Sequence, residues 1–214
     1  VLPMLGVEQI NQLYAAYLQE QNVIVSFTAP DKDNVILPDE NEVRRVLANA
    51  KNLEIEAPKE EQMDMTLVKK SPKAANKIKK VTVNEKLGTT EWLLKNGIRV
   101  IIKNTDFKQD EILMRAYSQG GLSLVTDINL LPSATTSTDV VEYCGLGELS
   151  MVQLQKALAG KNVSVNPTIN AYNEQIYGSA SVKDFETMLQ LTYLYFTAPR
   201  KDTGAFQTPM SMLE

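Results

Sequence analysis

Histidine is absent from the 214-residue sequence, and Cys144 is its single cysteine. A Ser-His or Cys-His nucleophile pair needs an imidazole, zinc hydrolases almost always use at least one histidine ligand, and an intrachain disulfide needs two thiols. Carboxylates, lysines, tyrosines and hydroxyls therefore remain as the groups available for chemistry. We expect Cys144 to be a small buried apolar residue rather than a reactive thiol.

Long apolar runs and an excess of positive charge are also missing. No stretch reaches the roughly 18 consecutive apolar residues of a membrane-spanning helix, and no targeting segment opens the sequence. The net charge of −4 and the pI of about 5.1 argue against nucleic acid and anionic membranes as partners. Because the sequence lacks an initiator methionine and its last helical pattern stops abruptly at Glu214, we expect a piece of a longer protein.

The first fifty residues have the pattern of a helix, a strand and a second helix. Apolar residues recur at spacings of three and four across Gly6–Gln21, which predicts an amphipathic helix facing a core. Asn22–Ala29 alternates apolar and polar residues and predicts a short strand. Pro38 and Asp39 precede a third periodic segment, and Asp39 is expected to cap that helix.

The next stretch, Glu54–Lys86, is rich in lysine and poor in large apolar residues. A lysine cluster can bind nucleic acid, but no aromatic residue is interleaved here and acidic residues stand on both sides. We therefore predict a solvated linker covering residues 54–87.

Glu91–Gly121 predicts a β-hairpin. Its first part, from Trp92 to Ile102, is rich in β-branched residues around an Asn96-Gly97 turn or bulge signal, and Ile112–Tyr117 forms the returning strand. Gly120 and Gly121 then end the strand.

The remaining residues alternate helical and strand signals. The hydroxyl-rich Ser133–Thr138 is expected to supply caps or turns, and Ser150 with Gln153 forms a capping box ahead of a helix that ends near Gly160. Asn162–Pro167 and Asn170–Ser179 predict a second hairpin. Ser181 is expected to cap a long helix that ends at Pro199, and another helix should begin at Asp202. The buried face of the long helix is expected to comprise Phe185, Met188, Leu189, Tyr193 and Phe196.

This order predicts an α+β fold, with a mainly antiparallel sheet and helices packed on one side. The hairpin with its Asn-Gly signal and following glycine-containing loop resembles the opening of a domain of the pitrilysin/insulinase zinc metallopeptidases, also called inverzincins. The resemblance covers residues 88–214 and, less closely, 6–50. It implies that residues 1–53 end one pitrilysin-like domain, that 54–87 join two halves, and that 88–214 begin an inactive domain.

The resemblance also indicates where the chemistry of the family would lie. Such enzymes carry His-x-x-Glu-His on the first helix after the opening hairpin, with both histidines on zinc and the glutamate polarising water. In that register this sequence has Asp139, Glu142 and Tyr143, so only the glutamate matches. Tyrosine is a poor neutral zinc ligand, so we predict no metal and no catalysis here, and we expect zinc in another half of the parent protein.

The main hypothesis is a non-catalytic segment of a bacterial zinc metalloendopeptidase, forming part of a peptide-enclosing chamber and the connector between halves. Its expected partners are the rest of the parent chain and peptide substrates, and the resemblance favours a periplasmic or otherwise exported protein. The alternative is a catalytically dead structural or interaction subunit, which an upstream His-x-x-Glu-His would exclude. An independent enzyme using Asp139, Glu142 or Lys156 has no supporting constellation.

Overall fold

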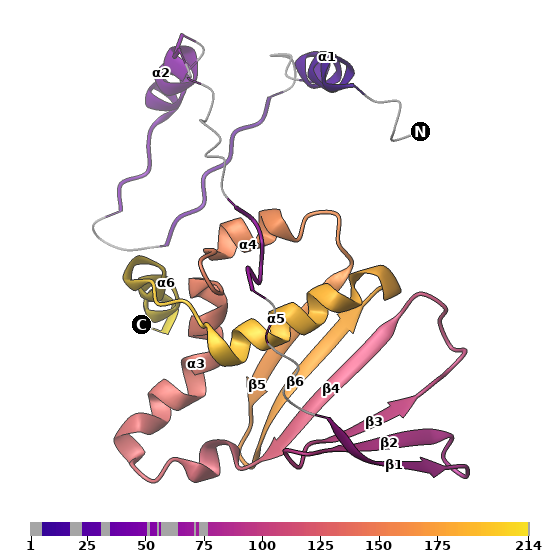
Figure 1. Cartoon of the computed structure of the whole chain (residues 1–214). Coiled ribbons are helices and arrows are strands. Elements are labelled where there is room, and N and C mark those ends of the chain that lie inside the picture. The colour runs from indigo at the N-terminus through magenta and orange to yellow at the C-terminus, as the bar shows by residue number, and fades with distance from the viewer. Residues whose placement is uncertain are drawn as a thin grey trace. The chain divides into compact units, whose positions relative to one another are not determined.

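The computed structural model describes residues 6–17, 23–30, 35–50, 52–54, 56, 64–70, 72 and 77–213 (Figure 1). The chain divides into two units, Val1–Glu61 and Gln62–Glu214. The sequence-based domain boundaries at residues 53 and 87 remain predictions.

The first unit contains two helices, α1 (Val7–Tyr17) and α2 (Glu40–Ala50). Asp39 caps α2 as predicted, because its Oδ1 accepts a hydrogen bond from the Glu42 N–H at 2.8 Å. The predicted strand at Asn22–Ala29 was wrong, since residues 23–30 form no strand. Alternating apolar and polar residues form a strand only where a neighbouring strand supplies the backbone hydrogen bonds. The apolar side chains predicted to make α1 core-facing are exposed, and residues 18–21 of that predicted helix lie outside the described residues.

The second unit begins its regular structure with a three-stranded antiparallel sheet in the order β1-β2-β3. The strands are β1 (Ile78–Asn84), β2 (Thr89–Leu94) and β3 (Arg99–Lys103). Gly97 closes the β2–β3 hairpin with a φ of 89°, a left-handed conformation that glycine adopts without strain. The Asn96-Gly97 signal was therefore a hairpin turn.

Two sequence predictions need correction here. Ile112–Tyr117 does not return against β3, because β4 (Ile112–Gln119) pairs with a distant strand in another sheet. The predicted linker is not solvated throughout, since Leu67 and Val68 within it pack against the core of this unit; the same range also contains the exposed strand β1. Lys69 reaches Glu148, with its Nζ 2.5 Å from the carboxylate.

The second sheet is also antiparallel, in the order β4-β6-β5, with β5 at Val163–Ile169 and β6 at Asn173–Ala180. This confirms the predicted second hairpin. Between β4 and β5 lie two 3₁₀ turns, η2 (Gly121–Leu124) and η3 (Ile128–Leu130), and two helices, α3 (Leu131–Cys144) and α4 (Met151–Ala157). After β6 come the 3₁₀ turn η4 (Val182–Asp184) and helices α5 (Phe185–Thr197) and α6 (Thr203–Leu213).

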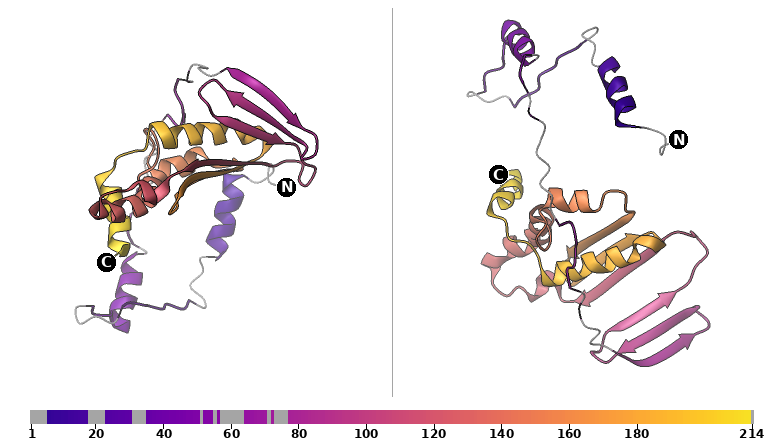
Figure 2. Two further views of the ribbon diagram at one scale, coloured as in Figure 1. Left: turned by 90° about the horizontal axis from the view of Figure 1, so that it is seen from below. Right: turned by 45° about the horizontal axis from the view of Figure 1, so that its top comes forward.

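Helix α5 runs along one face of the β4-β6-β5 sheet (Figures 1 and 2). Its buried residues are Thr187, Met188, Leu191 and Leu194, so the predicted buried face was right only at Met188. Gly178 on β6 permits this close packing, because a Cβ there would lie 2.7 Å from the Met188 Sδ. The core is thus formed by the sheet, the inner face of α5 and Leu146 in the segment between α3 and α4, and it comprises Leu146, Val165, Ile176, Ala180, Met188, Leu191 and Leu194.

Candidate functional site

Helix α3 carries the residues predicted to replace a zinc motif. It begins with Pro132 in its first turn, where the missing N–H costs no helical hydrogen bond. The hydroxyl-rich segment lies inside this helix rather than in a cap or turn. Its hydroxyls donate back to helix carbonyls, Thr135 to Leu131 at 2.8 Å and Thr136 to Pro132 at 3.1 Å.

Asp139, Glu142 and Tyr143 stand three and four residues apart on α3, so the helix brings them onto one side. The Asp139 and Glu142 side chains are exposed, and Tyr143 is half-buried. Among the residues that the structure describes, no three His, Cys, Asp or Glu side chains form a group able to hold a metal ion.

Glu142 has an electrostatic effect on the neighbouring helix. Burial raises the pKa of the Tyr195 phenol on α5, and the negative charge of Glu142 raises it further. Glu142 helps to keep a nearby phenol protonated, and this effect was not predicted from the sequence.

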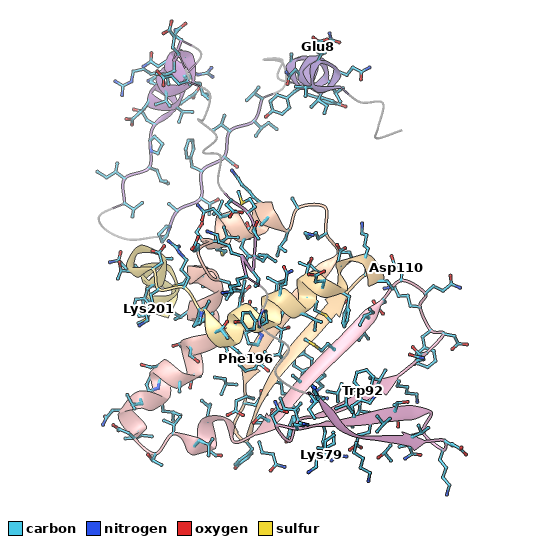
Figure 3. The ribbon with its side chains drawn as sticks, in the orientation of Figure 1. Glu8, Lys79, Trp92, Asp110, Phe196 and Lys201 are labelled. Atoms are coloured by element: carbon cyan, nitrogen blue, oxygen red, sulfur yellow. The ribbon has the colours of Figure 1, made fainter. Side chains whose placement is uncertain are left out.

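A pocket of about 510 Å³ lies beside α3, on the side of Ser137, Thr138 and Val141. The other walls come from β4, β5, β6, η2 and the C-terminal end of α5, where Figure 3 labels Phe196. The described residues lining it through apolar or aromatic side chains are Ala116, Tyr117, Leu124, Val141, Pro167, Ile169, Ile176, Tyr195 and Phe196. This volume lies within the range of small-ligand sites.

Glu174 on β6 is the one charged residue among the described residues that line this pocket. Its Oε1 accepts a hydrogen bond from the Gly121 N–H at 2.8 Å. Its Oε2 is buried and has no hydrogen-bond partner among the described residues. Gly121 has a φ of 61°, and a Cβ there would collide with the Asn170 carbonyl oxygen. The glycine thus allows the N–H to approach the carboxylate.

Neither Glu174, nor Tyr195, nor the pocket was predicted from the sequence. Glu174 and Gly121 are 53 residues apart, and no local motif connects them. The Gly120-Gly121 pair was the available signal, although it was interpreted only as the end of a strand.

A polar network joins neighbouring side chains of β4 and β6. Arg115 donates to the Gln175 Oε1 at 2.8 Å, and the Tyr177 hydroxyl donates to the same oxygen at 2.6 Å. The Arg115 guanidinium also lies 5.3 Å from the centre of the Tyr177 ring, within range of a cation–π interaction. Gln175 is buried, with 8% of its surface exposed. These contacts fix side chains that a strand pattern predicts only as solvent-facing.

No family model matches the chain. It is 30% identical over 159 residues to a zinc protease PQQL-like protein of Arabidopsis thaliana, a match covering 72% of this chain and 14% of the relative. It is 29% identical over 103 residues to the probable zinc protease PqqL of Haemophilus influenzae, covering 47% of this chain and 11% of that protein. The chain thus spans a small part of the length of these curated relatives.

Solved structures share the fold. The periplasmic protease PqqL from Escherichia coli superposes with a TM-score of 0.63 at 19% identity, over 82% of this chain and 19% of that one. The ferredoxin protease FusC, solved as a point mutant in complex with Arabidopsis ferredoxin, gives a TM-score of 0.57 at 19% identity, over 94% of this chain and 22% of that one. The chain thus has the α+β fold of these solved structures, and the proteins that it resembles in sequence and structure are zinc proteases of the pitrilysin/insulinase family.

Proposed function

We propose that this chain is a non-catalytic segment of a zinc metalloendopeptidase. In the parent protein it forms part of the wall of a peptide-enclosing chamber and the connector between the two halves. The observation that carries the proposal is the position of Asp139, Glu142 and Tyr143 on α3, the first long helix after the hairpin, where a zinc-binding relative would have His-x-x-Glu-His.

The donors present on α3 do not fit zinc. Asp139 is an exposed carboxylate, Tyr143 offers a phenol, and Cys144 is buried at the end of the helix with its Sγ 3.6 Å from the Asp202 carbonyl oxygen. A tetrahedral zinc site needs several deprotonated or imidazole ligands facing one point. We therefore assign no reaction step to a metal on this segment and place the zinc in another part of the parent protein.

Two properties of the structural neighbours extend the proposal to substrate and compartment. One neighbour is described as a periplasmic protease, and the other was solved with a ferredoxin. We infer an exported parent protein that acts on peptides or small proteins. None of the described helices is long and apolar enough to cross a membrane.

The proposal is tested in the intact parent enzyme by changing Glu142→Gln. Peptide hydrolysis should stay within about twofold of the unmodified enzyme, because no metal-bound water needs Glu142 as a base. The same change at the glutamate of an intact His-x-x-Glu-His elsewhere in the parent should reduce turnover by roughly 10²–10⁴-fold.

Thermal melts of both variants separate lost chemistry from lost folding. A large loss of turnover in a stably folded Glu142→Gln enzyme would show that α3 takes part in catalysis. A parent that lacks peptide hydrolysis entirely would favour the alternative of a dead structural subunit.

A further inference from the structure

We propose that the pocket between α3, α5 and the β4-β6-β5 sheet binds the side chain of a peptide lysine, with Glu174 as the partner of its ammonium group. This inference deepens the proposed function, because it names the chemistry by which this wall of the chamber holds a peptide. Every residue used to argue it belongs to the second unit of the chain.

The pocket suits a long apolar stem. Leu124, Val141 and Ile176 provide aliphatic walls. Phe196, with 72% of its surface accessible, also lines the pocket. A lysine side chain has a four-carbon stem that such walls remove from water, at roughly 0.8 kcal/mol per buried methylene.

The charge inside the pocket is negative. Glu174 supplies a carboxylate, and the described lining residues include no lysine, arginine or histidine. Its buried Oε2 lacks a partner among the described residues, whereas nearly all buried polar atoms in folded proteins have one. A cationic group that reached this oxygen would satisfy it with a charge-assisted hydrogen bond.

An ammonium fits this carboxylate better than a guanidinium does. Arginine pairs best when both carboxylate oxygens are free for its planar fork. Here Oε1 already accepts the Gly121 N–H, so Oε2, which is buried, is the one of the two oxygens that lacks a partner among the described residues. A single oxygen suits the compact point charge of lysine.

A peptide lysine is favoured over a free amine because the pocket is larger than one side chain. A volume of about 510 Å³ leaves space for the backbone next to the lysine. Both sources share the alkylammonium chemistry, so the binding test compares them directly.

The test uses the 214-residue chain and NMR titration with three probes. The first is a capped pentapeptide with lysine at its centre between serines and glycines, the second has norleucine in place of lysine, and the third is n-butylamine. We expect saturable binding of the lysine peptide, at least about tenfold weaker binding of the norleucine peptide, and weaker binding of n-butylamine.

Three variants locate the site. Glu174→Gln keeps an oxygen for the Gly121 N–H but removes the charge, and it should weaken lysine-peptide binding by about tenfold or more. Glu186→Gln removes an exposed carboxylate on α5 and should leave binding unchanged. Ser137→Leu fills the pocket while Glu174 stays intact and should also abolish binding, which keeps the test valid if Glu174→Gln fails to fold.

Equal binding of the lysine and norleucine peptides, or unchanged binding in a folded Glu174→Gln chain, would overturn the proposal. Binding of n-butylamine as tight as the peptide would overturn the assignment to a peptide. Either result would leave the non-catalytic role intact, because that role is tested by hydrolysis in the parent enzyme.

Discussion

The packing of α5 against the sheet determines the positions of Tyr195 and Phe196 at its C-terminal end. Substitutions at the contact between Gly178 and Met188 test this packing. Met188 is 0% exposed beneath β6. A Cβ added at position 178 would lie 2.7 Å from the Met188 Sδ and 3.0 Å from the Met114 Cε. Because favourable contacts between such atoms begin at about 3.5 Å, the sulfur must move by roughly 1 Å or the strand must shift.

Gly178→Ala should therefore lower the free energy of unfolding by about 1–3 kcal/mol, the usual cost of overpacking a core. Met188→Ala should lower it by about 2–5 kcal/mol, since it removes a fully buried side chain and leaves a cavity. In the double variant the methyl group added at position 178 would enter the space that Met188 vacates. The combined loss should be smaller than the sum of the two single losses by about 1 kcal/mol.

Urea denaturation followed by far-UV circular dichroism measures all three variants. Gly204→Ala is the matched control, because a Cβ there meets only the Asp202 Oδ1 at an ordinary 3.5 Å and lies in the first turn of α6. It should be neutral or stabilise the chain by up to about 1 kcal/mol. A Gly178→Ala chain as stable as the original, or strict additivity in the double variant, would refute the packing described for α5.

Three further predictions concern metal binding, pH dependence and the predicted linker. The chain dialysed against zinc should retain no stoichiometric, chelator-sensitive metal on the Asp139–Tyr143 side of α3, and a retained ion would contradict our assignment. Hydrogen bonds from the Ser181 hydroxyl and the Asn162 N–H hold the pKa of Asp184 below its ordinary 3.8. The stability that these bonds contribute is therefore complete above pH 3.8 and is lost as the pH falls through the lower pKa of the folded state. Asp184→Asn should make the melting temperature fall less steeply at acid pH, and identical curves for the two proteins would disprove this linkage. Limited trypsin should cleave between residues 54 and 77 before it cleaves the helix at Ser150–Ala159, and the reverse order in mass spectrometry would argue against a linker.

Local signals predicted local structure well. The Ser150–Gln153 capping box forms with both hydrogen bonds, Asp202 accepts from the first N–H groups of α6, and the β5–β6 hairpin pairs in register. Each depends on residues a few positions apart, so the sequence contains the information directly.

Predictions that required a choice between faces or partners were less accurate. Helix α5 has large apolar residues around most of its circumference, with Phe185, Leu189 and Tyr193 exposed and Leu191 and Leu194 buried. Periodicity alone cannot select one of two apolar stripes, because the choice depends on where the sheet lies and on the space that Gly178 leaves. The pairing of β4 with β6 likewise depends on residues about sixty positions apart.

The two sides of α3 explain why the helix can form without a metal. On one side, Val141 packs against the core, Ser137 and Thr138 line the pocket, and the buried Cys144 approaches the segment before α6. Asp139 and Glu142 are exposed and contribute to none of these contacts. The helix is therefore held by apolar packing rather than by ligands, and its remaining glutamate acts on the Tyr195 phenol. Through Ser137, Thr138 and Val141 the helix also forms one wall of the pocket, and we therefore propose that this segment acts through contact with peptides.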